Sequence, residues 1–193
     1  MGEKQNQPFQ LSFNASLKVD FQGSWVTSDG GLILVRELDE RLGFSELMEQ
    51  YLTDSRGKNT QLPLADLLRQ SLYSRLAGYE DVNDAERLSQ DPTFRLIGSE
   101  KIWERGAALT SRLQSFETEM LAEEENLAGL KAISRDLIAK AGSVDSQQRV
   151  VKTGGRLIKH ARYCWLLLAE SHLTRRLFGA MLQRIAALPS PAG

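Results

Sequence analysis

The hydrophobic positions near the start of the chain first follow a strand period. Leu17, Val19 and Phe21 alternate with polar residues, as in a strand with one buried face. A turn follows, and residues 25–26 can pair back as a second strand. We therefore expect a short β-hairpin over about 16–26.

The period then changes to that of a helix. From about residue 31 to 42 the apolar residues recur three and four positions apart, and Gly43 follows as a helix stop. Oxygen-bearing side chains at 27–29 stand where they can cap the first turn. Asp39 and Glu40 are expected on the solvent side. A second helix is expected from Ser45 to Leu52.

The stretch from 64 to 97 is predicted to fold into three short helices. Pro63 stands at the start of the first of them, where its missing N–H costs nothing. Gly78 supplies a left-handed exit, Asn83 or Asp84 can cap the second helix, and Asp91 followed by Pro92 restarts the chain. The apolar face of the first helix consists of Leu64, Leu67, Leu68, Leu72 and Leu76.

Arg75 falls on the apolar side of this first helix. A covered guanidinium needs a carboxylate, and the nearest candidates in sequence are Glu80, Asp81 and Asp84. The alternative is that Arg75 contacts a DNA phosphate. Capping and charge pairing explain the acids of this region better than a metal site, because their spacing does not fit a calcium loop.

Two further helical regions follow. A long pattern begins at Thr110 or Ser111, with Ser111 and Gln114 spaced as a capping box. Gly129 and the acidic run 123–125 can divide this pattern into two helices. From 153 onward we expect an amphipathic helix and then, after Ser171, a last helix that runs to about Ala187. This C-terminal helix pair is basic.

Charge is distributed unevenly along a chain of ordinary soluble composition, with 41% hydrophobic and 25% charged residues and a net charge of −1. Residues 1–148 carry 16 Lys/Arg and 24 Asp/Glu, whereas residues 149–193 carry eight and one. An acidic body with a basic tail indicates either a phosphate-binding tail or pairing of the two parts. No apolar leader or membrane span is expected, so the expected location is the cytoplasm, with no membrane partner.

Two segments carry a family resemblance. The strings TSDGGLILVRELDERLG (Thr27 to Gly43) and LLRQSLYSRLAGYEDVNDAERLSQDPTFRLI (Leu67 to Ile97) resemble the N-terminal region of bacterial insertion-sequence transposases of the DDE group 1 family. The stretch from about Lys152 to Leu188 resembles the C-terminal end of the same family.

The resemblance implies DNA cleavage and joining by two Mg²⁺ ions, which two Asp and one Glu hold on an RNase H-like core. In relatives the first Asp comes shortly after a segment like DSQQRVV (Asp145 to Val151). Here Lys152 follows that segment. We find no counterpart of the three acids, so we expect no catalytic residue, no bound metal or cofactor, and no catalysis by the chain alone. The simplest account is an internal deletion at roughly 146–152.

The fold class expected from these patterns is mainly α. A helical N-terminal domain (1–148) includes the short hairpin, helices from about 31 and a long central helix or helix pair. A basic helix pair (149–193) follows. We expect no RNase H-like sheet, because no run after Val26 has the pattern of a set of strands.

The expected function is that of a truncated transposase remnant that binds DNA or oligomerises without strand transfer. By resemblance, its partners are the terminal repeats of the element and either a second copy of the chain or an intact transposase. The alternatives are a non-functional product of a decayed gene and a dominant-negative regulator. The candidate DNA-binding residues are Arg69, Arg75, Arg156, Lys159, His160, Arg162, Arg175 and Arg176.

Overall fold

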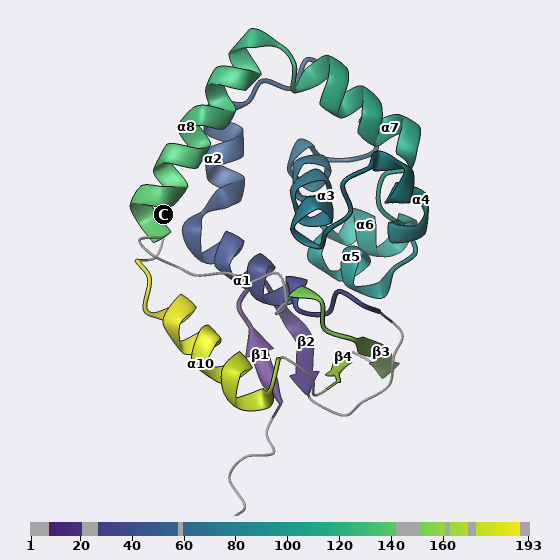
Figure 1. Ribbon diagram of the computed structural model, residues 1–193, viewed down its shortest axis with the longest axis vertical. Helices are drawn as coiled ribbons and strands as arrows, with labels where there is room; N and C mark the ends of the chain where they lie inside the picture. Colours follow the sequence, from purple (N-terminus) through teal and green to yellow (C-terminus); the bar gives the residue numbers. More distant parts are fainter. Residues whose placement is uncertain are drawn as a thin grey trace, which may run out of the picture.

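A computed structural model describes residues 8–20, 27–57, 60–141, 151–160, 163–169 and 173–189. Helices predominate, as expected, and they form an open ring above a small sheet (Figure 1). The elements of the N-terminal half are β1 (Phe9–Leu11), β2 (Asn14–Asp20), α1 (Leu32–Leu42), α2 (Phe44–Tyr51), α3 (Leu64–Leu76), η1 (Val82–Asp84), α4 (Ala85–Leu88) and α5 (Pro92–Ile97). The remaining elements are α6 (Glu100–Arg105), α7 (Thr110–Ser115), η2 (Phe116–Met120), α8 (Glu124–Ala141), β3 (Gly155–His160), β4 (Tyr163–Leu168) and α10 (Arg175–Ala186).

The sheet joins the two ends of the chain. Its strand order is β1-β2-β4-β3, with β2 and β4 parallel and the other two pairs antiparallel. Val19 of β2 lies beside Leu166 of β4, and Leu157 of β3 lies beside Leu166 on its other side. The C-terminal segment therefore completes a sheet that the N-terminal segment begins.

The expected hairpin exists, but its bounds were wrong. The strand around Leu17 and Val19 is confirmed, and its antiparallel partner is β1 at residues 9–11. Residues 25–26, the expected partner, lie outside the described residues. The segment Phe9–Leu11 alternates apolar and polar residues, but its three residues are too few for the pattern to be recognised from sequence alone.

The expected C-terminal helix pair was also wrong, and so was the expectation of no strands after Val26. Residues 155–160 and 163–168 form the hairpin of β3 and β4, and only α10 is helical. A short apolar run fits a helical arc and a buried strand equally well. Here β2 pairs with β4 as a parallel neighbour, and this tertiary contact favours a strand over a helix for residues 163–168.

One hydrophobic core unites the sheet with α1, α5 and α10. Leu17, Val19, Leu166 and Leu168 point into it from the sheet and are fully or almost fully buried. From α10, Phe178 contributes a ring whose centroid lies 4.9 Å from that of Phe9. The C-terminal segment is thus part of the core that covers the N-terminal strands.

A second core lies among the helices, and α3 contributes to it in an unexpected way. Leu67 and Leu68 are buried as predicted, but Leu72 and Leu76 are 39% and 42% exposed. They border an apolar groove of about 410 Å³ between α1, α3 and the end of α8. The other side of α3 is buried instead, and it is polar.

Most of the predicted helix boundaries are confirmed. Gly43 and Gly78 have φ values of 68° and 83°, as left-handed exits require. Asp91 caps α5 by accepting hydrogen bonds from the backbone N–H groups of Thr93 and Phe94. Asp84 stands at the N-cap position of α4, as one of the two alternatives predicted, but its side chain makes no capping hydrogen bond. The side chain that caps in this region is Asp81, at the start of η1.

The long central pattern is divided, as one of the two alternatives predicted. The break falls at residues 121–123, beside the acidic run, and follows the π-helical stretch η2. Gly129 does not break the helix but lies inside α8. The capping box was wrong, because α7 begins after Leu109 without a side-chain cap.

Candidate nucleic-acid interface

Arg69 lies in a buried polar cluster between α1 and α3. Its guanidinium makes two bonds to the Asp39 carboxylate, of 2.7 and 2.9 Å, and a third to the Ser45 hydroxyl. The Tyr73 hydroxyl donates to the same carboxylate at 2.6 Å. Asp39 is therefore buried rather than solvent-facing as expected, and Arg69, which is 5% exposed, is not at a surface where DNA could reach it.

Burial and the Asp39 carboxylate together determine the pKa values of Arg69 and Tyr73. Burial alone would lower the pKa of Arg69, but its bonds to Asp39 outweigh this effect and leave that pKa above its ordinary value. Burial, together with the negative charge of Asp39, raises the pKa of Tyr73 well above its usual range. The cluster thus holds a charged arginine and a neutral tyrosine around one carboxylate.

Arg75 forms an internal ion pair, as one of the two alternatives predicted, but with a different partner. Its guanidinium makes two 2.8 Å contacts to the Glu117 carboxylate, which lies in the π-helical stretch η2. The bond from Arg75 lowers the pKa of Glu117. Sequence proximity suggested Glu80, Asp81 or Asp84, whereas tertiary packing brings a residue 42 positions away.

The turn at residues 27–31 lies against the segment 151–155. The Gly30 N–H donates to the Thr153 carbonyl at 2.6 Å, and the Thr27 and Gly155 backbones exchange two hydrogen bonds. A Cβ atom at Gly30 would lie 2.9 Å from the Thr153 carbonyl oxygen, so this close approach requires glycine. The Asp-Gly-Gly sequence therefore serves to dock the C-terminal segment.

Asp29 is the buried charge of this junction. Its carboxylate lies 2.9 Å from the Lys152 ammonium and accepts a 2.8 Å hydrogen bond from the Tyr79 hydroxyl. Burial lowers the pKa of Lys152, but bonds to Tyr79 and Asp29 more than offset this and raise it. The expectation that residues 27–29 cap α1 was wrong, because α1 begins without a side-chain cap.

Arg175, at the start of α10, is also engaged within the protein. Its guanidinium lies 2.6 Å from the Asp20 carboxylate and 4.8 Å from the ring centroid of Phe9. Asp20 is buried at the end of β2. This candidate therefore ties α10 to the sheet.

The other candidate DNA-binding residues lie on or near β3 and on α10, and the structure describes the side chains of only some of them. Arg156 on β3 and Arg176 on α10 are exposed, and Arg184, two turns along α10, is exposed as well. None of the three forms an ion pair with a carboxylate of the described residues. The backbones of Lys159 and His160 belong to β3, but their side chains, like the whole of Arg162, lie outside what the structure describes.

Two residues that sequence reasoning missed lie on the outer face of the sheet. Lys18 and Trp165 are neighbours across β2 and β4, and the Lys18 ammonium lies 5.4 Å from the Trp165 ring centroid. Both are half-buried. The alternation of β2 already placed Lys18 opposite Leu17 and Val19, but the pairing with Trp165 required the correct assignment of β4.

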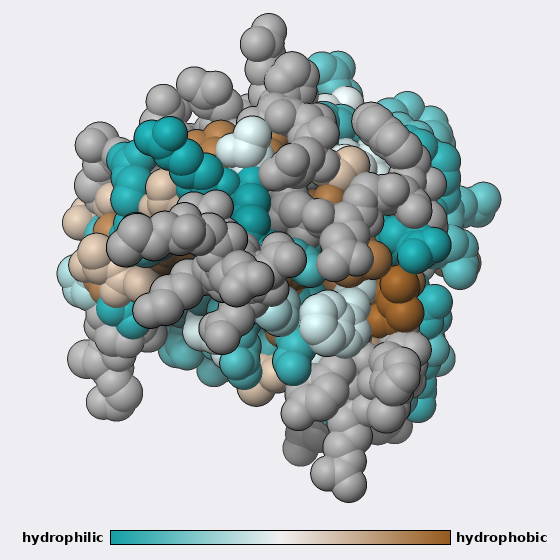
Figure 2. All heavy atoms as spheres, turned by 90° about the horizontal axis from the view of Figure 1, so that it is seen from below, coloured by the Kyte–Doolittle hydropathy of each residue, from teal (hydrophilic) through white to brown (hydrophobic). Residues whose placement is uncertain are grey.

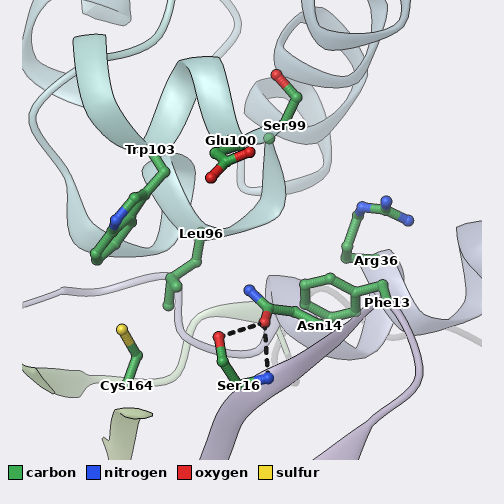
Figure 3. A pocket seen from close by; sticks show the side chains of 10 residues that line it. Phe13, Asn14, Ser16, Arg36, Leu96, Ser99, Glu100, Trp103 and Cys164 are labelled. Atoms are coloured by element: carbon green, nitrogen blue, oxygen red, sulfur yellow. Dashed lines mark hydrogen bonds between the residues drawn. The ribbon is translucent and has the colours of Figure 1, made fainter. Parts of the chain in front are cut away.

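A cleft of about 470 Å³ lies between the sheet and α5–α6 (Figure 3). Asn14, Ser16 and Cys164 reach it from the strands, and Trp103 and Glu100 from α6. Asn14 is bonded to Ser16 by the hydrogen bonds drawn in Figure 3. Glu100 is the one acid among the residues that line the cleft, so they do not supply a set of carboxylates for a divalent metal.

Within the described ranges no three His, Cys, Asp or Glu side chains gather as metal ligands would. The same ranges include no helix that is both long and apolar enough to cross a membrane.

Comparison with known proteins gives one result. No curated protein and no solved structure matches the chain. The profile of the family described as "Transposase DDE domain group 1" matches residues 9–151, which is most of the sequence. This chain belongs to the group 1 family of DDE transposase domains.

Proposed function

We propose that the chain is a DNA-binding remnant of a transposase that does not itself transfer strands. Family membership relates the chain to transposition. The observation that carries the DNA-binding proposal is the set of exposed arginines Arg156, Arg176 and Arg184, for which the described residues offer no ion-pair partner. Exposed guanidinium groups bind phosphates with release of counterions, which is the sequence-independent part of DNA affinity.

The packing of the C-terminal segment supports this assignment of the basic surface. Arg69 and Arg175 are engaged in buried or largely buried ion pairs, and the exposed Arg75 is paired with Glu117. The arginines on β3 and α10 project from a sheet and a helix anchored in the main core, so their backbone is rigidly positioned. An anchored backbone needs no ordering of its own when these side chains bind phosphates.

The proposal predicts a specific salt dependence. The triple variant Arg156→Ala/Arg176→Ala/Arg184→Ala should bind duplex DNA more weakly at every sequence. The slope of log affinity against log salt should fall by up to about 3, roughly one for each phosphate that an arginine no longer neutralises. Fluorescence anisotropy with a duplex from the end of an insertion sequence of this family, and with a scrambled duplex, measures both quantities.

A control variant that removes the same charge elsewhere shows whether weaker binding comes from the loss of this surface or from the change in net charge. Lys101, Arg105 and Arg112 are exposed on α6 and α7, and changing all three to alanine removes the same charge. This variant should keep the wild-type slope. Equal losses in the two triple variants, or no loss in the first, would contradict the proposed surface.

We further propose that an internal deletion joined the N-terminal region to the C-terminal end near 146–152. Two family-like segments adjoin there, and residues 151–155 find backbone partners in the turn at 27–31. Sequencing the locus tests this: an intact relative of the element, with extra coding sequence at this point, is the expected result. An unrelated complete gene would contradict it.

A regulator that pairs with intact transposase is the second candidate, and it differs from a decayed product in requiring a stable fold. The buried Leu166, Leu168, Phe178 and Ile185 favour the regulator, because these side chains of the C-terminal segment are covered. We expect a cooperative thermal transition and a single sedimenting species. Broad melting with heterogeneous aggregates would favour decay instead.

A further inference from the structure

We propose that the outer face of the sheet is a stacking platform for an unpaired strand of DNA. This inference rests on the proposed DNA binding and goes beyond it, because it names the form of DNA that this face accepts. The geometry comes from one row of side chains that crosses all four strands.

Strand register defines this row. Gln10 of β1 is paired with Lys18 of β2, Lys18 with Trp165 of β4, and Trp165 with Ile158 of β3. Paired residues point to the same face of a sheet, so the four side chains form a line roughly 14 Å long at about 4.8 Å per strand. The next row of the sheet, Val19, Leu166 and Leu157, belongs to the core on the opposite face.

The chemistry of the row is that of a base-stacking surface. Trp165 offers an aromatic face, and Ile158 extends the apolar surface beside it. Gln10 is exposed, and the other three members are half-buried, so all four retain accessible surface. Aromatic side chains on a sheet stack with unpaired bases whatever the base, since every base has a π-face.

The charges around the row favour a polyanion. The Lys18 ammonium lies 5.4 Å from the centroid of the Trp165 ring, which places a positive charge beside any base that stacks on that ring. Arg156 stands two residues before Ile158 on the same face of β3 and is exposed. The acid on this face, Asp20, is paired with Arg175 at 2.6 Å and adds little repulsion.

Figure 2 looks at the lower end of the molecule, where the sheet lies. Among the coloured side chains there, polar teal and apolar brown ones lie close together. A protein partner of the obligate kind favours a continuous apolar patch. A mixed surface of aromatic, apolar and basic groups suits a nucleic-acid strand better.

The test compares two DNA forms on the full chain. Labelled oligo(dT) of about 12 nucleotides and a duplex of the same length are titrated with wild type, Trp165→Leu and Trp165→Phe. Trp165→Leu should weaken oligo(dT) binding at least about tenfold and duplex binding less than about twofold. Trp165→Phe, which keeps a ring, should weaken oligo(dT) binding by less than about threefold. Trp103→Leu, on the far side of the cleft, is the control and should bind oligo(dT) as wild type does.

Tryptophan fluorescence provides a second measurement, which is informative even if Trp165→Leu fails to fold. Oligo(dT) should quench tryptophan emission of the wild type, and most of this quenching should be lost in Trp165→Phe. Equal quenching in the two proteins, or oligo(dT) affinity that Trp165→Leu leaves unchanged, would overturn the platform. If the platform is overturned but the wild type still binds duplex DNA with the expected salt dependence, the proposed function stands. If the wild type binds neither oligo(dT) nor the duplex, both proposals are wrong.

Discussion

Changing Arg69 to alanine is expected to reduce the free energy of unfolding by about 3–5 kcal/mol, the range seen when one partner of a buried ion pair is removed. The reason is the carboxylate that remains. Asp39 is buried and loses two bonds of 2.7 and 2.9 Å, while Tyr73 and Arg36 compensate only in part. Urea denaturation followed by circular dichroism measures the change.

Two control variants make this prediction specific. Arg87→Ala removes an exposed arginine that pairs with Asp84 at 3.3 Å, and it should cost at most about 1 kcal/mol. The double variant Asp39→Asn/Arg69→Met leaves no buried charge in this pair and should recover part of the lost stability. A loss below about 1 kcal/mol in Arg69→Ala would mean that Asp39 is solvated in solution.

Helix α3 shows how far the hydrophobic pattern could predict the fold. The spacing of its leucines located the helix almost to the residue, because a helical period over several turns is a strong signal. It did not identify the buried side. Asp66 accepts two hydrogen bonds from Ser99, and the Gln70 amide bonds both backbone groups of Ala108. Such polar contacts between segments have no periodic signature in one sequence.

In the C-terminal segment the hydrophobic pattern failed in a different way, because it did not predict the type of secondary structure. Its apolar run was recognised, but its state depends on β2, which lies near the other end of the chain. The same dependence hid part of the candidate interface, since Lys18 and Trp165 become neighbours only when β4 is a strand. By contrast, the charge of the tail could be counted from sequence, and Arg156 and Arg176 are exposed as a DNA-binding role requires.

The contact between α2 and α8 is where we expect the second large effect. A Cβ atom at Gly129 would lie 2.1 Å from the Tyr51 carbonyl oxygen and 3.0 Å from a methyl of Leu52. The nearer atom belongs to the backbone, so it cannot turn aside as a side chain would. Gly129→Ala should therefore force the two helices apart, at a cost of about 3 kcal/mol.

Helix propensity opposes this loss. Alanine is favoured over glycine within a helix by about 1 kcal/mol, so the net destabilisation expected for Gly129→Ala is about 2 kcal/mol. For a chain of this size it corresponds to a melting temperature lower by about 4–8 °C. Gly57→Ala is the matched control, because nothing lies within 4 Å of a Cβ atom there, and it should melt as the wild type does. A Gly129→Ala protein that melts at or above the wild-type temperature would show that propensity outweighs the clash, and that α8 can move from α2 at little cost.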